Sequence, residues 1–542
     1  MANIEIDKRE FDELVGEEIT EEQLNEKASF LGAHWNHVEG PKWDVEVYPN
    51  RPDLLSVEGL ARAYRGFFGI DTGLEEYKPL KESPIKLEVD SSVEEVRPFI
   101  GAAVITDVEL SKKKINGLIQ LQEKLHETMG RRRDKLAIGL HDLSQVEPPF
   151  TYKAVEPGAV SFTPLEYDNE LQLGEILEEH EKGIEYSWIL EDEDLYPVIV
   201  DSEDKVLSFP PIINNQLTEV TPDTTDIFID VTGKDQDTVE KCLNILATAL
   251  GERGGRIEAV KVEGKMLPDL TPEKRELEVD YMNTVSGLDL SRKEITERLE
   301  KMKFGVKKTD PLKVKVPAYR TDVMHQYDLI EDVVIAHGYD NIEPEIPEID
   351  QVSQEKDVEK ISKLMTDILV GTGALESHTY ILSNHKKLYG NMEKEPGETV
   401  EMSNALTQDY TCARTWLLPS MMEVLRENRH HSYPQKFFEA EDVVEVVDGD
   451  AENRRHLAYV VSDNDTDFTD AREVLQIVGR DLGVYFEVEE DSRPYFRDGR
   501  SASVKVEGQE VGFIGEFSEE VVENWSLTRN VSGFELDLEK LK

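Results

Sequence analysis

Four acidic side chains between Tyr319 and Val333 constrain the fold of this chain more than any other feature. From Asp328 onward, apolar residues recur at helical spacing and Gly338 follows as a stop signal, so the sequence predicts a helix here. Residues three and four positions apart share one side of a helix, which brings like charges together. Such a group requires a cation, a shared proton or a basic partner. We call these residues the carboxylate box: Asp322, Asp328, Glu331 and Asp332.

Spacing alone leaves two explanations of the carboxylate box open. The first is a magnesium site, because Mg²⁺ takes oxygen ligands and keeps several waters. In the second, Asp328 and Glu331 complement the positive end of the helix dipole. Arg320 or His325 would then be the nearby basic partner.

The sequence of this segment closely resembles a signature of the β subunit of phenylalanyl-tRNA synthetase, of the archaeal and eukaryotic branch. The strings that carry the resemblance are YRTD, DLIED and GYDNI. A second string of these subunits, NRPDLLSVEG, occupies residues 50–59, although NRPD taken alone is ordinary turn chemistry with Asp53 as a helix-start charge. In the family, the matching carboxylates hold a magnesium ion at the border with the α subunit. The resemblance therefore implies these Mg²⁺ ligands: Asp322, Asp328, Glu331 and Asp332.

The length and charge of the chain predict a large acidic protein. With 542 residues it exceeds a single core, and we expect about three to five domains. Its 114 acidic and 61 basic residues give a formal charge of −53, spread along the whole sequence. Periodic apolar segments argue against intrinsic disorder. Dispersed acidity on a folded chain favours adaptation to high salt, which screens self-repulsion.

The same charge restricts the partners and the location that we expect. It disfavours nucleic-acid contacts except at basic islands such as Arg131–Arg133, and we expect no DNA partner. Cys242 and Cys412 match neither a disulfide framework nor a zinc motif. The charged N-terminus is no signal peptide, and no apolar run approaches about 18 residues, so we expect a cytoplasmic protein without a membrane partner.

The order of segments along the sequence predicts a multidomain α+β protein with four domains. Their character follows from the resemblance: an N-terminal α/β domain, a β-rich editing domain, a small winged-helix-like domain with the carboxylate box, and an inactive class II synthetase-like domain with an antiparallel sheet. In that order, the predicted boundaries are 1–94, 95–270, 271–347 and 348–542.

Local signals predict several elements within these domains. Ser291 and Glu294 form a capping box that starts a helix over 292–303. An apolar stripe from Ile115 to Leu125 predicts another helix, with Gln122 as its one polar interruption. In the last domain we expect a long helix over 414–429 and a strand over 436–447.

The segment 206–234 of the second domain alternates strand and turn signals, and its paired prolines and asparagines predict an irregular wall. On the residues alone, a β-hairpin with polar turns is the favoured explanation of this segment. The strings SFPPIIN and DVT resemble the wall of the editing domain, which in the family hydrolyses tyrosine mischarged onto the phenylalanine tRNA. We expect the following editing residues: Ser208, Asn215, Asp230 and Thr232, with His141 opposite.

The sequence near this segment shows no Ser-His-Asp or Cys-His pattern. This favours hydrolysis by an oriented water over attack by a covalent nucleophile. We expect the 3′ end of the tRNA to approach near Arg131–Arg133. The last domain resembles a class II catalytic fold that lacks its site. A working site needs an Arg on the final helix to clamp ATP phosphates, whereas the final segment carries Glu535 and Asp537.

Three hypotheses follow. In the first, the chain is the β subunit of an α2β2 phenylalanine–tRNA ligase, with Mg²⁺ and ATP as cofactors, ATP held mainly by the α subunit, and tRNA(Phe) as partner. In the second, it is a non-catalytic synthetase-like scaffold. In the third, it is a free-standing aminoacyl-tRNA deacylase that uses its second domain alone.

Overall fold

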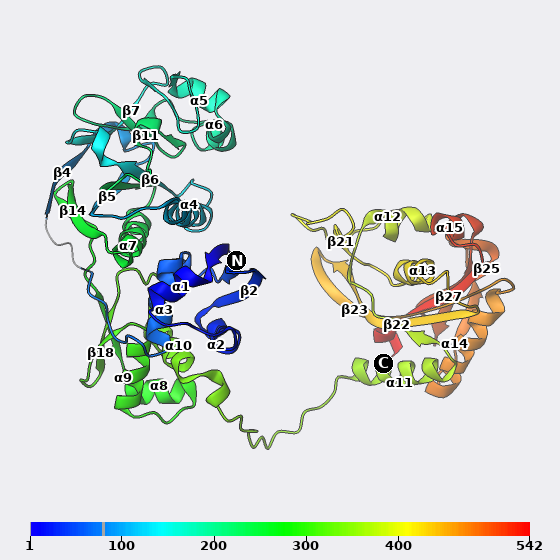
Figure 1. Cartoon of the computed structure of the whole chain (residues 1–542). Helices are drawn as coiled ribbons and strands as arrows, with labels where there is room; N and C mark the ends of the chain where they lie inside the picture. Colours follow the sequence, from blue (N-terminus) through cyan, green and yellow to red (C-terminus); the bar gives the residue numbers. More distant parts are fainter. Residues whose placement is uncertain (1, 78–81, 542) are drawn as a thin grey trace. The chain divides into compact units, whose positions relative to one another are not determined.

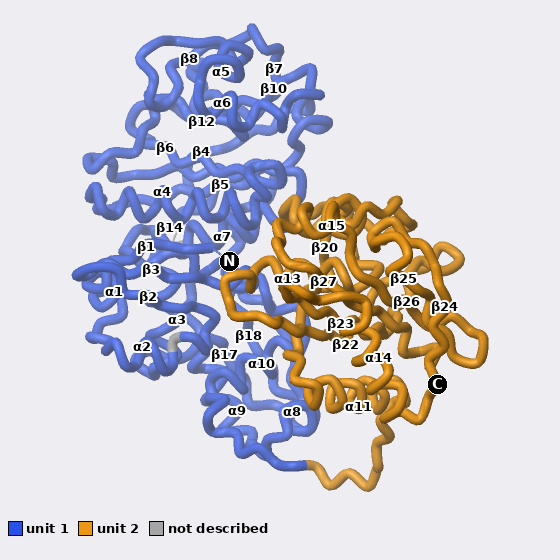
Figure 2. Tube along the Cα trace, turned by 90° about the vertical axis from the view of Figure 1, so that its right-hand side faces the viewer, with its two compact units in different colours: residues 1–346 blue, residues 347–542 orange. Residues whose placement is uncertain are grey.

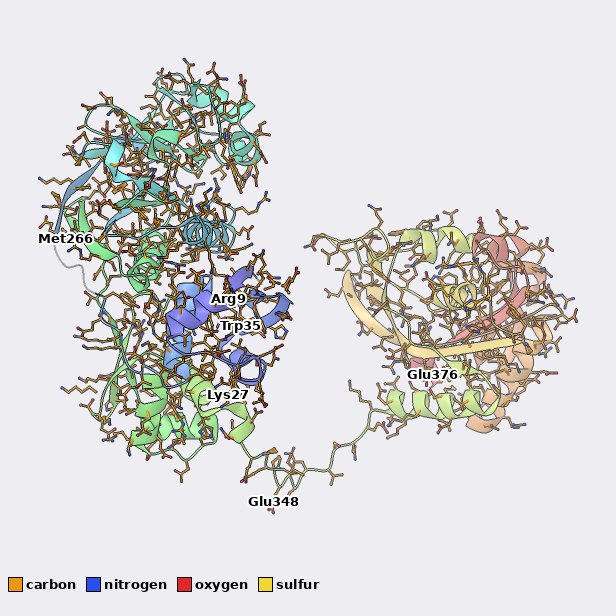
Figure 3. The ribbon with its side chains drawn as sticks, viewed as in Figure 1. Arg9, Lys27, Trp35, Met266, Glu348 and Glu376 are labelled. Atoms are coloured by element: carbon orange, nitrogen blue, oxygen red, sulfur yellow. The ribbon has the colours of Figure 1, made fainter. Side chains whose placement is uncertain are left out.

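The computed structural model describes residues 2–77 and 82–541 and divides into two compact units, Met1–Ile346 and Pro347–Lys542 (Figure 2). Residues 347–356 have no regular secondary structure, and Figure 3 labels Glu348 in this segment. Along the described ranges, no helix is both long enough and apolar enough to cross a membrane.

The first unit begins with a three-stranded antiparallel sheet covered by helices. Its strand order is β1 (Ala2–Asp7), β3 (Lys42–Val47), β2 (Ala33–Glu39), and its helices are α1 (Lys8–Val15), α2 (Glu21–Lys27) and α3 (Val57–Phe67). Trp35 of β2 donates from Nε1 to the Tyr64 hydroxyl of α3 at 2.9 Å. Phe11 of α1 packs edge-on against Trp35, so aromatic rings join the sheet to both helices.

A ten-stranded mixed sheet follows, in the order β12-β11-β10-β7-β4-β14-β5-β13-β6, with β15 paired to β14. Its central strands are β4 (Glu82–Val89), β14 (Arg256–Val262), β5 (Phe99–Thr106), β13 (Ile227–Gly233) and β6 (Leu136–Asp142). The other strands are β7 (Phe150–Val155), β10 (Tyr196–Val200), β11 (Val206–Phe209), β12 (Ile213–Asn214) and β15 (Lys265–Leu267).

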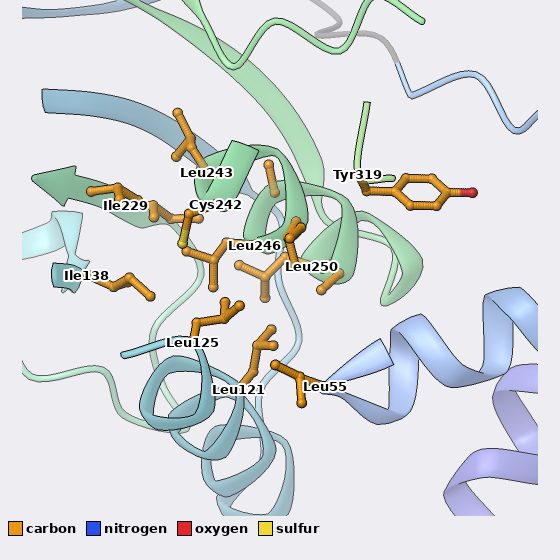
Figure 4. Close-up of a cluster of buried hydrophobic side chains, with 14 of the residues drawn as sticks. Leu55, Leu121, Leu125, Ile138, Ile229, Cys242, Leu243, Leu246, Leu250 and Tyr319 are labelled. Atoms are coloured by element: carbon orange, nitrogen blue, oxygen red, sulfur yellow. The ribbon is translucent and has the colours of Figure 1, made fainter. Parts of the chain in front are cut away.

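Two long helices, α4 (Lys112–Glu127) and α7 (Gln236–Glu252), pack on this sheet. Figure 4 shows their contact, in which Cys242 and Leu246 of α7 lie close to Leu125 of α4 and Ile138 of β6. Burial raises the pKa of the Cys242 thiol. The helix predicted around the 115–125 stripe is confirmed by α4.

The third part of the first unit is small. Its sheet order is β16 (Glu273–Leu277), β18 (Leu312–Val316), β17 (Gly305–Lys307), with helices α8 (Val279–Ser286), α9 (Arg292–Lys301) and α10 (Gln326–His337). The Ser291–Glu294 capping box at the start of α9 is confirmed. The helix ends two residues earlier than predicted, because Lys303 has a left-handed φ of 68° that a helix cannot continue.

The second unit is a seven-stranded sheet in which β19 and β22 pair in parallel and the other neighbours are antiparallel. In sheet order, the strands are β19 (Leu375–Glu376), β22 (Gln435–Val447), β23 (Asp450–Asp463), β27 (Asn530–Asp537), β26 (Gln509–Phe517), β25 (Phe496–Val506) and β24 (Glu487–Glu490). Helices α11 (Asp357–Gly371) and α14 (Phe468–Leu482) cover one face, and α13 (Leu418–Glu427) and α15 (Glu519–Asn524) the other (Figure 1). The strand predicted over 436–447 is confirmed.

Two predictions for this unit are wrong. The helix expected over 414–429 is α13, which is shorter at both ends. Pro419 sits in its first turn, where proline is tolerated, while Arg414 lies before the helix in a buried ion pair with Glu439 at 2.8 Å. The final segment, compared above with a catalytic helix, is the central strand β27.

Candidate functional site

A cavity of about 530 Å³ opens beside the large sheet of the first unit. Three segments build much of its wall: the helix α4, the strand β6, and the irregular stretch between β11 and β12 that contains Pro210 and Pro211. Ile115 and Ile119 of α4 and Ile212 of the stretch give it apolar lining. The predicted irregular wall is therefore a wall of a real cavity.

Asp230 supplies a buried carboxylate to the lining of this cavity. It lies on β13, in register between Ala102 of β5 and Gly139 of β6, and is 1% exposed. Its Oδ1 is 2.8 Å from Nε2 of His141, whose Nδ1 is 2.8 Å from Oγ1 of Thr218. Both ring nitrogens of His141 are thus engaged, which fixes the imidazole behind Asp230. Among the described residues, no hydrogen bond engages Asp230 Oδ2, which leaves that oxygen for a ligand or a water.

Gly139 makes room for this pair. A Cβ added at Gly139 would lie 2.2 Å from Asp230 Oδ1 and 2.6 Å from His141 Nε2, which are distances that real Cβ atoms do not show. No sequence pattern marks this glycine, since the need for it depends on the Asp230 side chain, which comes from β13.

Ser208 offers the second polar group. It lines the cavity from β11, and its Oγ is buried with no hydrogen-bond partner in the part of the chain that the structure describes. Buried hydroxyls are nearly always paired, so an unpaired one at a cavity wall is placed to bond a ligand or water.

Three predicted editing residues do not line the cavity. His141 contacts Asp230 from behind, and the other two hold the wall. Asn215 donates from Nδ2 to the Val206 carbonyl at 2.6 Å and accepts from the Leu217 N–H at 2.9 Å. Thr232 accepts from Arg97 Nε at 3.0 Å. Both side chains hold the wall in shape, and neither lines the cavity.

Polar residues of α4 that the sequence reasoning missed complete the site. Gln122 donates to the carbonyl of Ile138 at 2.8 Å, and His126 Nε2 accepts the N–H of the same residue at 2.8 Å. Burial lowers the pKa of His126 to about 4, so the ring is neutral near pH 7. These bonds pin α4 to β6. The signal was visible as the polar interruption of the apolar stripe by Gln122.

Of the basic island, the structure brings Arg133 alone to the cavity. Arg131 and Arg132 are exposed, whereas Arg133 is buried and donates to the Ile212 carbonyl and to Glu123, each at 2.8 Å. Burial acts to raise the pKa of Glu123, but bonds and charges from His126 and Arg133 outweigh it and lower that pKa to about 2. Glu123 therefore stays ionised and locks Arg133 against the irregular wall.

The carboxylate box lies elsewhere in the first unit. Arg320 donates from Nε and Nη2 to both oxygens of Asp322, at 2.8 and 2.7 Å, and from Nη2 to Asp332 at 2.6 Å. Asp328 instead accepts the N–H groups of residues 324 and 325 at the start of α10, and Glu331 is exposed. The four carboxylates therefore have three different environments. Asp322 and Asp332 bind a buried arginine, Asp328 caps a helix, and Glu331 faces solvent.

The NRPD string and the carboxylate box meet in this buried cluster. Arg51 donates to both oxygens of Asp53 at 2.8 Å, and a cavity of about 10 Å³ has Arg51, Asp53 and Arg320 in its wall. Burial acts to raise the pKa of Asp322, but Arg320 outweighs it and lowers that pKa to about 2. For Asp332, burial and the charge of Asp322 outweigh Arg320 and raise the pKa to about 6.

This geometry does not fit a magnesium ion held by all four carboxylates. No three members of the box bring oxygens within 4.8 Å of one another along the described chain, and Arg320 already supplies a cation to two of them. A Mg²⁺ ion needs near-octahedral oxygen ligands, which two carboxylates bound to a guanidinium do not offer. The magnesium site remains a prediction from the resemblance.

Comparisons with known proteins agree with this architecture. Family models match three stretches: "B3/4 domain" at residues 108–260, "tRNA synthetase B5 domain" at 275–339, and "Phenylalanyl tRNA synthetase beta chain CLM domain" at 342–538. The fold is thus a multidomain α+β protein of the aminoacyl-tRNA synthetase class.

Individual relatives identify the family within this class. The phenylalanine–tRNA ligase β subunit of Archaeoglobus fulgidus is 44% identical over 537 residues, covering 98% of this chain and 96% of that protein. That of Pyrococcus abyssi is 40% identical over 560 residues, covering all of both chains. A solved N-terminal fragment of the β subunit from Pyrococcus horikoshii, 40% identical, superposes with a TM-score of 0.60 and covers 62% of this chain and all of the fragment. The chain belongs to the phenylalanine–tRNA ligase β-subunit family.

Proposed function

We propose that this chain, assembled with an α subunit as an α2β2 heterotetramer, takes part in the ATP-dependent attachment of phenylalanine to tRNA(Phe). ATP is held mainly by the α subunit. The chain's own chemistry is hydrolysis of tyrosyl-tRNA formed in error, in the cavity beside the large sheet. The observation that carries this assignment is buried Asp230, which lines that cavity and is held from behind by His141.

The hydrolysis needs one oriented water. Asp230 Oδ2 accepts a hydrogen bond from the water, whose oxygen attacks the carbonyl carbon of the aminoacyl ester. The bond to the ribose oxygen breaks, the ribose oxygen takes up a proton, and tyrosine leaves as the free acid. His141 holds Asp230 in the required orientation from behind, since its other nitrogen is fixed by Thr218. Positioning of this kind replaces a covalent nucleophile.

Selection of tyrosine follows from the unpaired Ser208 hydroxyl. A tyrosyl group can bond it through the phenol oxygen, whereas a phenylalanyl group leaves it buried and unpaired, at a cost of about 1–3 kcal/mol. An apolar synthetic pocket rejects an added hydroxyl only modestly, so a second, polar pocket supplies the missing discrimination.

The test uses the assembled enzyme in high salt. Asp230→Ala is expected to charge phenylalanine normally and to accumulate tyrosyl-tRNA. Asp237→Ala is the matched control, because that side chain is 72% exposed on α7 and pairs with Lys241. Deacylation of tyrosyl-tRNA by Asp230→Ala at the wild-type rate would refute the assignment of the site.

We further propose that residues 271–347 form a winged-helix-like domain used for assembly and 348–542 a class II-like domain without catalysis. In the latter, buried Glu535 accepts the N–H groups of Leu417 and Leu418 at 3.0 Å and pairs with His456 at 2.7 Å. A carboxylate that binds the start of α13 repels ATP phosphates rather than clamping them. A cytoplasmic, high-salt setting is the one that the charge of −53 favours.

The free-standing deacylase and the scaffold are the competing proposals. Size exclusion of the chain alone and with its α partner separates them, because the ligase subunit elutes as a larger complex only in the mixture. ATP–pyrophosphate exchange by the chain alone would contradict a silent last domain.

A further inference from the structure

We infer that the second unit holds a site for a thiolate-binding divalent cation, Zn²⁺ or its substitute Co²⁺, formed by His385, Glu401 and Cys412. One imidazole nitrogen, one carboxylate oxygen and the Cys412 Sγ all lie within 4.8 Å of one another. Within residues 2–77 and 82–541, this is the one group of three or more His, Cys, Asp or Glu side chains that close. No sequence motif predicts this site, because the spacing of the three residues matches no zinc motif.

The backbone brings the three ligands together. His385 begins α12 (His385–Leu388), one residue after the end of β20 (Leu382–Ser383). Cys412 begins β21 (Cys412–Ala413), and Figure 1 labels α12 and β21. Cys412 pairs with Ser383 on one side and forms an isolated antiparallel bridge with Glu401 on the other. Cys412 therefore sits between the segments that carry the other two ligands, and three stretches distant in sequence share one small ladder.

The donor set suits Zn²⁺ better than Mg²⁺. Imidazole, carboxylate and thiolate are all ligands of Zn²⁺ and Co²⁺, while Mg²⁺ takes oxygen ligands. One thiolate and one carboxylate neutralise a divalent ion completely, so the bound cluster carries no net charge. The Cys412 thiol loses its proton to solvent on binding, which makes the affinity rise with pH.

The exposed side of the cluster has the freedom that binding requires. In a tetrahedral zinc site the metal lies about 2.0–2.3 Å from each ligand, which sets the ligand atoms about 3.5 Å apart. His385 and Glu401 now contact each other directly, but their side chains are 44% and 55% exposed and can separate around an ion. Cys412 is fully buried and anchors the site, and a water completes the fourth position.

A metal here would add a cross-link to a stretch that has little regular secondary structure. Between 377 and 416 the regular elements are short: β20 and β21 have two residues each, and α12 has four. An ion bound to His385, Glu401 and Cys412 would fix this stretch at three points. The site is thus structural, and it does not depend on the proposed editing chemistry.

The test titrates Co²⁺ into the full-length chain after chelator treatment, with a phosphine reductant. Wild type is expected to bind one equivalent with thiolate-to-cobalt charge-transfer absorption in the near ultraviolet, which Zn²⁺ abolishes by displacement. Cys412→Ala should lack this absorption. Cys242→Ala is the matched control, because the other cysteine is buried in the core of the first unit and should leave the spectrum unchanged.

A second variant keeps the test decisive if Cys412→Ala does not fold. His385→Ala removes an exposed ligand and should weaken Co²⁺ binding at least about 100-fold, since even partners behind metal ligands contribute 10–100-fold. His378→Ala is its control: that histidine lies 3.9 Å from Glu376 on the surface, outside the metal cluster. Absence of charge-transfer absorption in wild type, its persistence in Cys412→Ala, or unchanged affinity in His385→Ala would each overturn the proposal.

Discussion

The Nε2 atom of His141 lies 2.8 Å from Oδ1 of Asp230, 89 residues further along the chain, and both side chains are buried. Neighbouring antiparallel strands create this contact, since β6 and β13 set Phe228 opposite His141 and Gly139 opposite Asp230. The two side chains meet diagonally across the ladder, and His141 fixes a carboxylate that lines the cavity.

His141→Leu should therefore impair editing. The substitution removes the donor to Asp230 and leaves a buried carboxylate less well paired, at a cost of about 1.5–3 kcal/mol of folding free energy. We expect tyrosyl-tRNA deacylation to fall at least tenfold, about 1.4 kcal/mol in activation free energy, with phenylalanine charging intact.

Single-turnover deacylation and urea unfolding measure the two effects. His34→Leu, on an exposed position of β2, is the control and should change neither. His141→Gln can donate again to Asp230 and should recover part of the rate. Equal rates for His141→Leu and wild type would show that Asp230 needs no support.

Gly139→Ala should damage the same pair from the other side. The added methyl would fall 2.2 Å from Asp230 Oδ1, so either the strand or the carboxylate has to move. Overpacking of this kind costs about 1–3 kcal/mol. Gly174→Ala is the matched control, because the closest atom to its new Cβ lies at 3.6 Å. A Gly139→Ala enzyme with normal deacylation and an unchanged melting temperature would contradict the geometry of the site.

Local signals predicted much of the fold but few contacts of the site. The capping box of Ser291 and Glu294 and the strand over 436–447 depend on neighbours in sequence, and both were confirmed. The helix predicted from residue 414 begins only at Leu418, because Pro419 belongs in the first turn of a helix. The His141–Asp230 contact depends on strand register, which short-range patterns do not encode.

The carboxylate box shows the same limit. The repulsion expected among these carboxylates correctly predicted a partner, and Arg320 is one of the two basic residues named for that role. Spacing along a helix could not show that Arg320 binds Asp322 and Asp332 while Asp328 caps the helix, because this division depends on the extended segment before α10.

Asp332 should make stability depend on pH. Its pKa is about 6 in the folded protein, through burial and the charge of Asp322, against an ordinary value of 3.8 in the unfolded chain. Between these values the folded protein holds more protons, so the free energy of unfolding falls as pH rises from about 4 to 6. The loss is at most about 3 kcal/mol for two pKa units.

Asp332→Asn removes this titration. Relative to wild type, the variant should therefore gain stability between pH 4 and pH 7, as measured by urea unfolding at fixed salt. Asp340→Asn, at an exposed position, should follow wild type. A difference between Asp332→Asn and wild type that stays constant across this range would show that Asp332 keeps the same charge throughout.

Arg320 should be more important to the carboxylate box than any added metal. Arg320→Met keeps the aliphatic volume but leaves Asp322 and Asp332 without their cation, and breaking a buried ion pair in this way costs about 3–5 kcal/mol. Thermal melts of wild type with Mg²⁺ and with chelator, at fixed ionic strength, should coincide, because the guanidinium already occupies the space between the two carboxylates. Lys293→Met, on an exposed position of α9, is the control for loss of a positive charge. A lower melting temperature in chelator, together with a mild effect of Arg320→Met, would instead favour the magnesium ion that the family resemblance predicts.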